Sequence, residues 1–328
     1  MSRRVSRVPT APRRRVSRHN DSLSHFAVEF QASQMDSLDL VSPYLFRYKG
    51  KNFVVQEGKT PQDLDKLRHL EVRPTDVYIV AFPKSGTLWM QQILVQIMDE
   101  AHPDQAEDDT NRNRVPWMEG GMVDDCQRER PDPRLNRTHL PPDMLPLGVK
   151  EKQVKTIYLL RNPKDVLVSL YHFSGSWVML ETPTSFNQFF DDFMDGKTFM
   201  GSWFDHVREY YREKDKMNLH YVMFEDMLKD AKGEVEKICK FLEKDLSDEA
   251  IHRVVESSTF DNMKTNPKAN FKDLLETGRY RKDKPTMRSG KAGDWKNYFT
   301  VAQNEYFDQV FQEKMEGIPL DITWEVKP

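Results

Sequence analysis

The sequence is poor in cysteine and has no long apolar stretch. Only two of its 328 residues are cysteines, Cys126 and Cys239. They could form one disulfide at most, which argues against a secreted disulfide scaffold. No apolar run approaches 18 residues, and the N-terminus lacks the apolar core of a signal peptide. We therefore expect a chain of the reducing cytosol (cytoplasmic), with no membrane-spanning helix and no membrane partner.

Several common motifs are also missing. The sequence contains no C-x-x-C, H-E-x-x-H or EF-hand spacing, so it predicts no metal site. The nucleophile elbow G-x-S-x-G, the dinucleotide fingerprint G-x-G-x-x-G and the Walker A loop G-x-x-x-x-G-K-[ST] are absent as well.

Positive charge is concentrated at the N-terminus. The first 20 residues hold seven arginines and no acidic residue, whereas the net charge of the whole chain is -3. The rest of the chain is therefore acidic, which argues against a nucleic-acid partner. We expect a disordered Arg-rich extension over residues 1–40 and one domain over residues 41–328. The extension is a plain tail, an organelle-targeting peptide or a binding arm, although Pro9 and Pro12 would break a targeting helix.

Three short apolar runs have the length and composition of buried strands, at 77–82, 154–160 and 219–224. Helical patterns follow at 87–100, 164–173, 231–243, 247–257 and 302–315. Strands that alternate with helices predict an α/β fold with a central parallel sheet flanked by helices. Ligands of such folds bind beyond the carboxyl ends of the strands. The long polar segments 102–136 and 260–295 are typical of lids or binding loops.

The first candidate site is the turn Pro83-Lys-Ser-Gly-Thr87, which lies between a predicted strand and a predicted helix. Helix N-termini bind anions through free backbone N–H groups, and Lys84 adds a full positive charge. Trp89, next along the helix, could stack on a purine. The alternative is a tight turn with an ordinary N-cap.

Three further segments are candidates for phosphate binding or proton transfer. Arg161 follows the second predicted strand, and Ser169 lies two turns into the next helix; without a ligand, Arg161 would pair with Asp165. His139, flanked by Arg137, suits a general base, although most histidines are structural. The basic, glycine-rich segment 288–296 could wrap a phosphate or be a mobile surface loop.

Together and in this order, the four segments resemble the cytosolic sulfotransferases. This family transfers a sulfuryl group from 3′-phosphoadenylyl sulfate (PAPS), with PAP as the second product, to a hydroxyl or an amine. The resemblance covers residues 46–324 and rests on the P-K-S-G-T-x-W loop at 83–89, the 3′-phosphate segment at 161–169 and the R-x-G-x-x-G-D-W-K loop at 288–296. Segments such as 89–93 and 318–324 are similar to the amine-sulfotransferase branch. The resemblance implies a nucleotide-kinase-like α/β domain.

The resemblance also implies a role for each matching residue. His139 would be the base, Lys84 would neutralise the leaving oxygen, and Arg137 would contact the sulfuryl oxygens, with no metal. The donor would be bound by Lys84, Ser85, Gly86, Thr87, Leu88, Trp89, Arg161, Ser169, Phe224, Ser258, Phe260, Arg288, Ser289 and Gly290. Trp117, His172, Phe173 and Trp177 would form the acceptor pocket, unless they are plain core. A homodimer is expected through Lys296, Thr300, Val301 and Glu305.

Three positions depart from the family pattern. Arg137 and Ser289 each replace a usual lysine, and Phe224 stands where many relatives have tyrosine. Arginine and lysine are not interchangeable, so these changes leave open a chain that binds PAPS or PAP with weak or no activity. A nucleotide kinase is disfavoured by the missing Walker lysine. The sequence does not decide between phenols, steroids and amines as acceptors.

Overall fold

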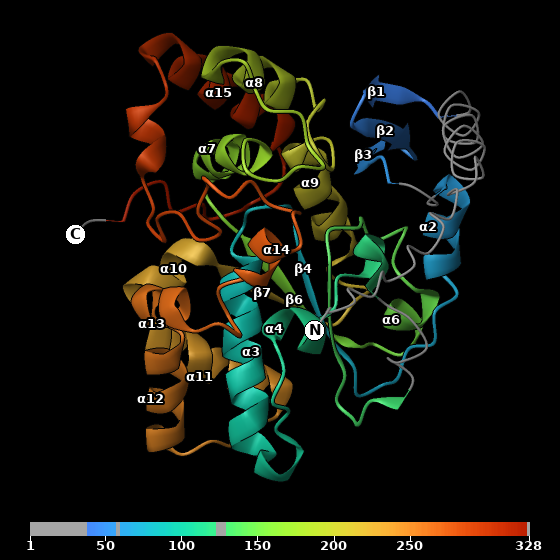
Figure 1. The fold of residues 1–328 in the computed structure, drawn as a ribbon, viewed down its shortest axis with the longest axis vertical. Coiled ribbons are helices and arrows are strands. Elements are labelled where there is room, and N and C mark those ends of the chain that lie inside the picture. The colour runs from blue at the N-terminus through green and yellow to red at the C-terminus, as the bar shows by residue number, and fades with distance from the viewer. Residues whose placement is uncertain (1–37, 57–59, 123–128, 327–328) are drawn as a thin grey trace, which may run out of the picture.

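The computed structural model describes residues 38–56, 60–122, 129–326. The predicted disorder of residues 1–40 falls almost entirely outside these residues. The first described strand, β1 (Leu40–Ser42), pairs with β2 (Leu45–Tyr48), which pairs in turn with β3 (Lys51–Val54), and this small antiparallel sheet packs at one side of the molecule (Figure 1).

The main sheet has four parallel strands in the order β5 (Leu135–Thr138), β4 (Val77–Ala81), β6 (Lys155–Leu160) and β7 (Leu219–Met223). Ile79 of β4 lies opposite Ile157 of β6 on one side and Arg137 of β5 on the other. Because all four strands are parallel, their carboxyl ends meet at one edge of the sheet. The chain leaves β4 toward β5 and then returns to β6 on the opposite side, the topology that opens a ligand crevice.

Residues of β4 alternate between two apolar layers. Val77, Ile79 and Ala81 face the layer of α3 (Thr87–Ala101), α11 (Ala231–Leu242) and α12 (Asp248–Ser257). Tyr78 and Val80 face the layer of α7 (Pro163–Ser174), α8 (Phe186–Met194), α9 (Trp203–Glu213) and α15 (Val301–Lys314). Figure 1 shows the two helical layers on either side of the sheet. The sheet is thus covered on both faces, as the sequence predicted.

Polar N-caps start several of these helices. The Asn162 side chain accepts from the Lys164 backbone N–H at the start of α7, and Thr300 forms a capping box with Gln303 at the start of α15. The shorter helices are α2 (Pro61–Leu67), η1 (Pro103–Gln105), α4 (Asn111–Arg114), η2 (Met118–Met122), α6 (Leu147–Glu151), α10 (Phe224–Lys229), α13 (Phe260–Thr265), α14 (Asp273–Glu276) and η3 (Asp294–Asn297).

The structure confirms the three predicted strands and the five predicted helices to within one or two residues at most ends. It differs in three places. The sequence did not predict β5, because Leu135–Thr138 is a polar four-residue strand at the sheet edge. Phe224 begins α10 instead of ending a strand. The segments 102–136 and 260–295 contain short helices. The sequence did not predict them, because these segments have too few apolar positions to show a helical period.

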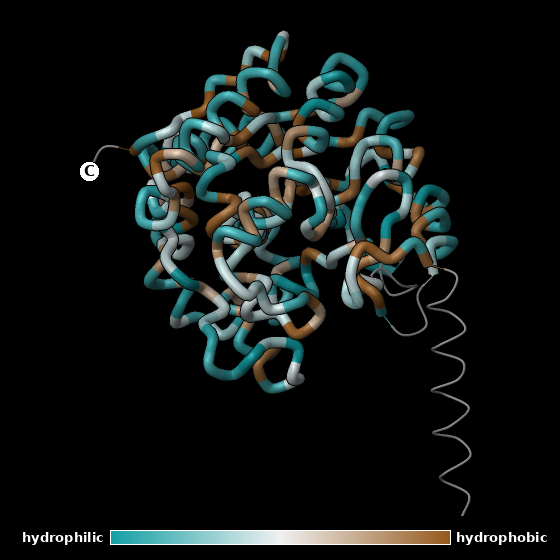
Figure 2. Tube along the Cα trace, turned by 90° about the horizontal axis from the view of Figure 1, so that it is seen from above, coloured by the Kyte–Doolittle hydropathy of each residue, from teal (hydrophilic) through white to brown (hydrophobic). Residues whose placement is uncertain are grey.

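Hydropathy follows this layered arrangement. The outer turns of the trace are mostly hydrophilic, and the hydrophobic segments lie mainly inside (Figure 2). Among the described residues, no helix is long and apolar enough to cross a membrane.

Candidate active site

The carboxyl ends of the four parallel strands open into a cavity of about 880 Å³. The loop after β4 supplies Lys84, β5 is followed by His139, β6 by Arg161 and β7 by Phe224. Every candidate donor, catalytic and acceptor residue except Ser85 lines this cavity. Ser85 is buried, and its Oγ lacks a hydrogen-bond partner. The fold therefore brings four segments that are far apart in the sequence into one site.

The loop after β4 requires a glycine. Gly86 has a φ of 108°, and a Cβ there would lie 2.8 Å from Cδ2 of Phe224. A larger residue would therefore push the Phe224 ring away and strain the backbone. α3 begins directly after Gly86, so its first N–H groups point toward the cavity. Such an arrangement suits the binding of an anion.

Arg161 joins two loops of the site. Its guanidinium donates to the carbonyl of Lys84 (3.1 Å) and to the carbonyl of Lys291 (3.1 Å), and it lies 4.3 Å above the Phe224 ring. Asp165 accepts from the backbone N–H groups of Gly293 (2.6 Å) and Trp295 (3.0 Å). Asp165 therefore holds residues 288–296, the C-terminal loop of the site, against α7, instead of forming the Arg161 ion pair considered from the sequence.

The C-terminal loop packs on α13. Gly290 has a φ of 63°, and a Cβ there would lie 2.3 Å from Cδ2 of Phe260. Arg288 reaches Asp294 of the same loop at 2.6 Å. Trp89 meets Phe224 edge to face, with ring centroids 5.4 Å apart. These contacts place aromatic rings and basic groups along one wall of the cavity.

The hydrogen bonds of His139 define its tautomer. Nδ1 lies 2.7 Å from the carbonyl of Ala81, and the backbone N–H donates to Oε1 of Glu119 (2.5 Å). A carbonyl only accepts, so Nδ1 carries the proton and Nε2 is left as an acceptor. Burial lowers the pKa of His139, and Arg137 and Lys84 lower it further, against the opposing effects of Glu119 and the Ala81 hydrogen bond. The ring is thus neutral near pH 7 and able to take up a proton at Nε2.

Two cations of the site form no direct ion pair among the described residues. The ammonium of Lys84 lies 4.2 Å from the Phe173 ring centre, and burial, with Arg161 and Arg288, lowers the pKa of Lys84 to about 8. The guanidinium of Arg137 lies 5.5 Å from the Phe271 ring centre, and its buried Nε lacks a hydrogen-bond partner. Burial lowers the pKa of Arg137 to about 10, although the nearby Glu119 carboxylate and Tyr280 oppose the shift. An anionic ligand would compensate both charges.

Aromatic rings form the wall next to His139. The Trp117 ring lies 6.0 Å from the imidazole of His139 and 5.9 Å from the ring of Trp177. Phe173 packs on Trp177 at 5.3 Å, and Nε2 of His172 lies 2.7 Å from the hydroxyl of Tyr298. All four predicted acceptor residues therefore line the cavity, and Trp117 and Phe173 also pack on Trp177.

Sequence reasoning missed two residues of this wall and one residue that supports His139. Phe199 lies within 6.4 Å of the rings of Trp117, His139 and Trp177, and Tyr280 pairs with Trp177 through an isolated β-bridge. Glu119, which holds the backbone of His139, comes from the π-helical turn η2. None of these residues stands in a recognisable motif, and only their distance in space reveals them.

The predicted dimer residues lie outside the cavity. Thr300 caps α15, and Val301 is 75% exposed at the first position of that helix. Glu305 is exposed one turn later, while Lys296 pairs with Glu325 at 2.6 Å.

Comparison with known proteins identifies the chain. Residues 74–319 match the model of the sulfotransferase domain. The chain belongs to the sulfotransferase family. It is similar to the amine sulfotransferase of Oryctolagus cuniculus, with 42% identity over 294 residues that cover 88% of this chain and 96% of the relative. Sulfotransferase 2B1 of Rattus norvegicus is 39% identical over 84% of this chain and 81% of its own length. These matches confirm the resemblance to the cytosolic sulfotransferases and to their amine branch.

Solved structures confirm the fold. The mouse sulfotransferase SULT7A1 in complex with PAP is 30% identical, with a TM-score of 0.68 over 84% of this chain and 95% of its own. Retinol dehydratase in complex with androsterone and PAP is 25% identical, with a TM-score of 0.74 over 89% of this chain and 95% of its own. In the part of the chain that the structure describes, no group of three or more His, Cys, Asp or Glu residues could hold a metal ion.

Proposed function

We propose that this sulfotransferase moves a sulfuryl group from PAPS to the hydroxyl, or the neutral amine, of a small apolar molecule. The observation that carries the proposal is the convergence of the His139 imidazole, whose Nε2 is free to accept a proton, and the Lys84 ammonium on a cavity lined by basic residues. The PAP complexes of the mouse sulfotransferase and of retinol dehydratase support the choice of donor.

The basic wall of the cavity suits the donor nucleotide. Ser85, Gly86, Thr87 and Leu88 at the start of α3 bind its 5′-phosphate. Arg161, Ser169, Arg288, Ser289 and Gly290 surround its 3′-phosphate. Trp89, Phe224, Ser258 and Phe260 enclose the adenine, an arrangement that favours stacking of a planar base between rings. Phe224 lacks the hydroxyl of a tyrosine but holds the Arg161 guanidinium through its ring face.

The reaction needs one base and two stabilising cations. When bound, PAPS supplies an activated sulfuryl group. His139 Nε2 takes the proton of the acceptor as the acceptor oxygen forms its bond to sulfur, and the electrons of the breaking sulfur–oxygen bond remain on the leaving phosphate. Lys84 neutralises the charge that develops on that oxygen, and Arg137 holds the sulfuryl oxygens. Charge stabilisation of this kind is a large contribution to enzymatic rate.

The charge of the cavity restricts the acceptor. Its ionisable wall residues other than His139, His172 and Tyr side chains are all basic, and no Asp or Glu is among the described residues that line it. The basic residues are Lys84, Arg112, Arg137, Arg161, Arg279, Lys284 and Arg288. Arg112 and Arg288 are paired with Asp273 and Asp294, and the remaining groups offer no carboxylate to a cationic acceptor. A protonated alkylamine also has no lone pair with which to attack sulfur, whereas a phenol, a steroid alcohol or a neutral arylamine fits the aromatic wall.

Replacement of His139 by alanine tests the proposal. We expect turnover to fall by about 10²- to 10⁴-fold, the usual contribution of a general base. PAP affinity should stay near that of the wild type, because His139 is not a donor-binding residue. In the wild type, kcat/KM should fall on the acid side only below pH 6.5, because protonation of His139, whose pKa is lowered, removes the base.

The matched control is His252→Ala, which removes an exposed histidine of α12 that does not line the cavity. It should leave turnover and PAP affinity unchanged. Wild-type protein that binds PAP but forms no sulfated product from phenols, steroids or arylamines would instead identify a donor-binding chain without activity.

A further inference from the structure

A second histidine lies behind His139 and takes no part in the chemistry described above. His206, on α9, has no exposed surface. Its Nε2 lies 3.1 Å from the backbone carbonyl of His139, and its Nδ1 lies 2.8 Å from the hydroxyl of Tyr158. A buried imidazole with a polar partner at each ring nitrogen has a fixed orientation, unlike a histidine that only fills apolar space.

The partners fix the tautomer of His206. The carbonyl of His139 can only accept, so Nε2 of His206 carries the proton and donates it. Nδ1 then accepts a hydrogen bond from the Tyr158 hydroxyl. Burial lowers the pKa of His206 well below 6.5, and the charge of Lys51 lowers it further, against the opposing effect of the hydrogen bond to the His139 carbonyl. His206 therefore stays neutral and keeps one orientation.

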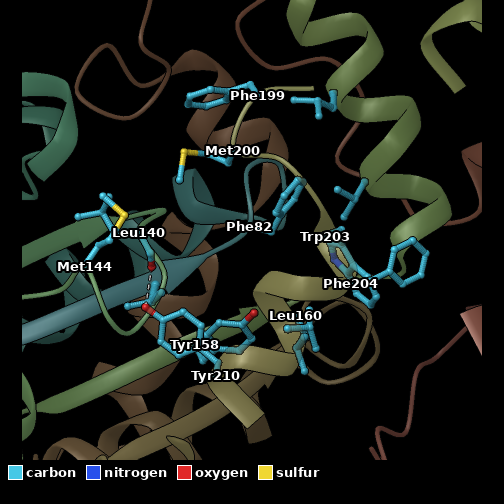
Figure 3. Packing of buried hydrophobic residues seen from close by; sticks show 14 of the residues in the cluster. Phe82, Leu140, Met144, Tyr158, Leu160, Phe199, Met200, Trp203, Phe204 and Tyr210 are labelled. Carbon is cyan, nitrogen blue, oxygen red and sulfur yellow. Dashed lines mark hydrogen bonds between the residues drawn. The ribbon is translucent and has the colours of Figure 1, made fainter. Parts of the chain in front are cut away.

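A neighbouring tyrosine holds the next carbonyl. The hydroxyl of Tyr210 donates to the carbonyl of Leu140 at 2.7 Å, and the rings of Tyr210 and Tyr158 lie 4.5 Å apart. Figure 3 shows Tyr158 and Tyr210 side by side below Leu140, with the Tyr210 hydrogen bond dashed. The Phe82 ring, 5.8 Å from His206, belongs to the residue just before the Pro83–Thr87 loop. His206 and Tyr210 thus contact the segment of His139 and Leu140, and His206 also contacts Phe82, which precedes the Lys84 loop.

Each polar group of His139 except Nε2 is then held by the protein. Glu119 holds its N–H, Ala81 holds Nδ1 and His206 holds its carbonyl. We infer that His206, oriented by Tyr158, is a positioning residue that fixes the backbone of His139 so that Nε2 points at the acceptor. This inference rests on the proposed function of His139 as the base.

Variants of His206 separate positioning from folding. His206→Phe keeps a ring but removes the donor to His139, and we expect kcat to fall by about 10- to 100-fold, the scale of a misplaced catalytic group. PAP affinity should change less than about twofold, since no donor-binding residue contacts His206. His206→Gln places an amide N–H where Nε2–H was, so it should recover most of the lost turnover.

Two further variants keep the test decisive if His206→Phe is unstable. The double variant His206→Phe/Tyr158→Phe removes both partners of one hydrogen bond, which is milder than leaving the Tyr158 hydroxyl unpaired. It should show the same loss of kcat. The matched control is Tyr221→Phe, because Tyr221 packs on Tyr158 but its hydroxyl donates to the backbone carbonyl of Tyr210 and contacts neither His206 nor His139. It should keep the kcat of the wild type.

The measurements are kcat and KM with PAPS and 2-naphthol, PAP affinity by calorimetry, and ¹⁵N-histidine NMR of the wild type. Near-normal kcat in the folded double variant, or a parallel loss of PAP affinity, would overturn the inference. An NMR signal of the wild type that shows His206 charged, or protonated at Nδ1, between pH 6 and 8 would also overturn it. This measurement does not depend on the stability of any variant. Loss of activity in His139→Ala with normal activity in the His206 variants would reject positioning and leave the proposed function intact.

Discussion

Replacement of Lys84 by methionine should stabilise the free protein while it abolishes most of the activity. Lys84 is a largely buried cation without an anionic partner among the described residues, and its pKa falls from 10.5 to about 8. Since a tenfold change in proton affinity corresponds to about 1.4 kcal/mol, this shift is equivalent to about 3 kcal/mol. That value is an upper limit on the penalty of the charged form, because the side chain is partly open to the cavity.

The pH dependence follows from the direction of the shift. Below pH 8, Lys84 is charged in both the folded and the unfolded chain, and the folded state bears the whole penalty. As pH rises from about 8 to 10.5 the folded state loses the proton first, so the wild type gains stability. Lys84→Met has no such group, so it should be more stable at pH 7 by about 1–3 kcal/mol and should lose this advantage at pH 10.5.

Thermal melts at pH 7 and pH 10.5, with and without PAP, measure this effect. At about 2–4 °C per kcal/mol, the variant should melt several degrees higher than the wild type at pH 7 without PAP. Saturating PAP should stabilise the wild type more than the variant, and the transfer rate of the variant should be at least about 10²-fold lower. The matched control, Lys66→Met, removes a 76% exposed lysine side chain and should change stability by only a few tenths of a kcal/mol.

Equal or lower melting of Lys84→Met at pH 7 would refute the argument. An advantage of the same size at both pH values would also refute it, because apolar packing of the methionine would then be the cause.

Two further predictions concern the C-terminal loop and the assembly. Gly290→Ala should weaken PAP binding by roughly tenfold, because a left-handed residue costs about 1–2 kcal/mol and its Cβ would displace the Phe260 ring. Gly317→Ala, with a φ of 74° and open space around its Cβ, has the backbone strain without the clash and should bind PAP normally. Val301→Glu should convert a weak homodimer into an active monomer, because each carboxylate would meet its copy across a two-fold contact. Sedimentation measures this, and a wild type that is monomeric at tens of micromolar would contradict the prediction.

The sequence by itself determined the elements and loops that carry the donor site. The run at 77–82 is continuously apolar, and the run at 154–160 is apolar except for Lys155 and Thr156, so both had to be buried strands. The loops that follow them combine proline with basic residues in recognisable spacings, and the first loop also contains Gly86. Local composition was sufficient here, because each motif lies within a few residues of one strand end. The parallel arrangement then placed both loops at the same edge of the sheet.

Only the tertiary structure decided how His139 is held. The polar strand β5 has no pattern of its own and forms because its backbone pairs with β4. That pairing sets the imidazole against the Ala81 carbonyl and so fixes its tautomer. Glu119 and His206, which hold the rest of its backbone, lie 20 and 67 residues away along the chain. Contacts over such separations depend on the packing of helices against the sheet, and no spacing in the sequence encodes them.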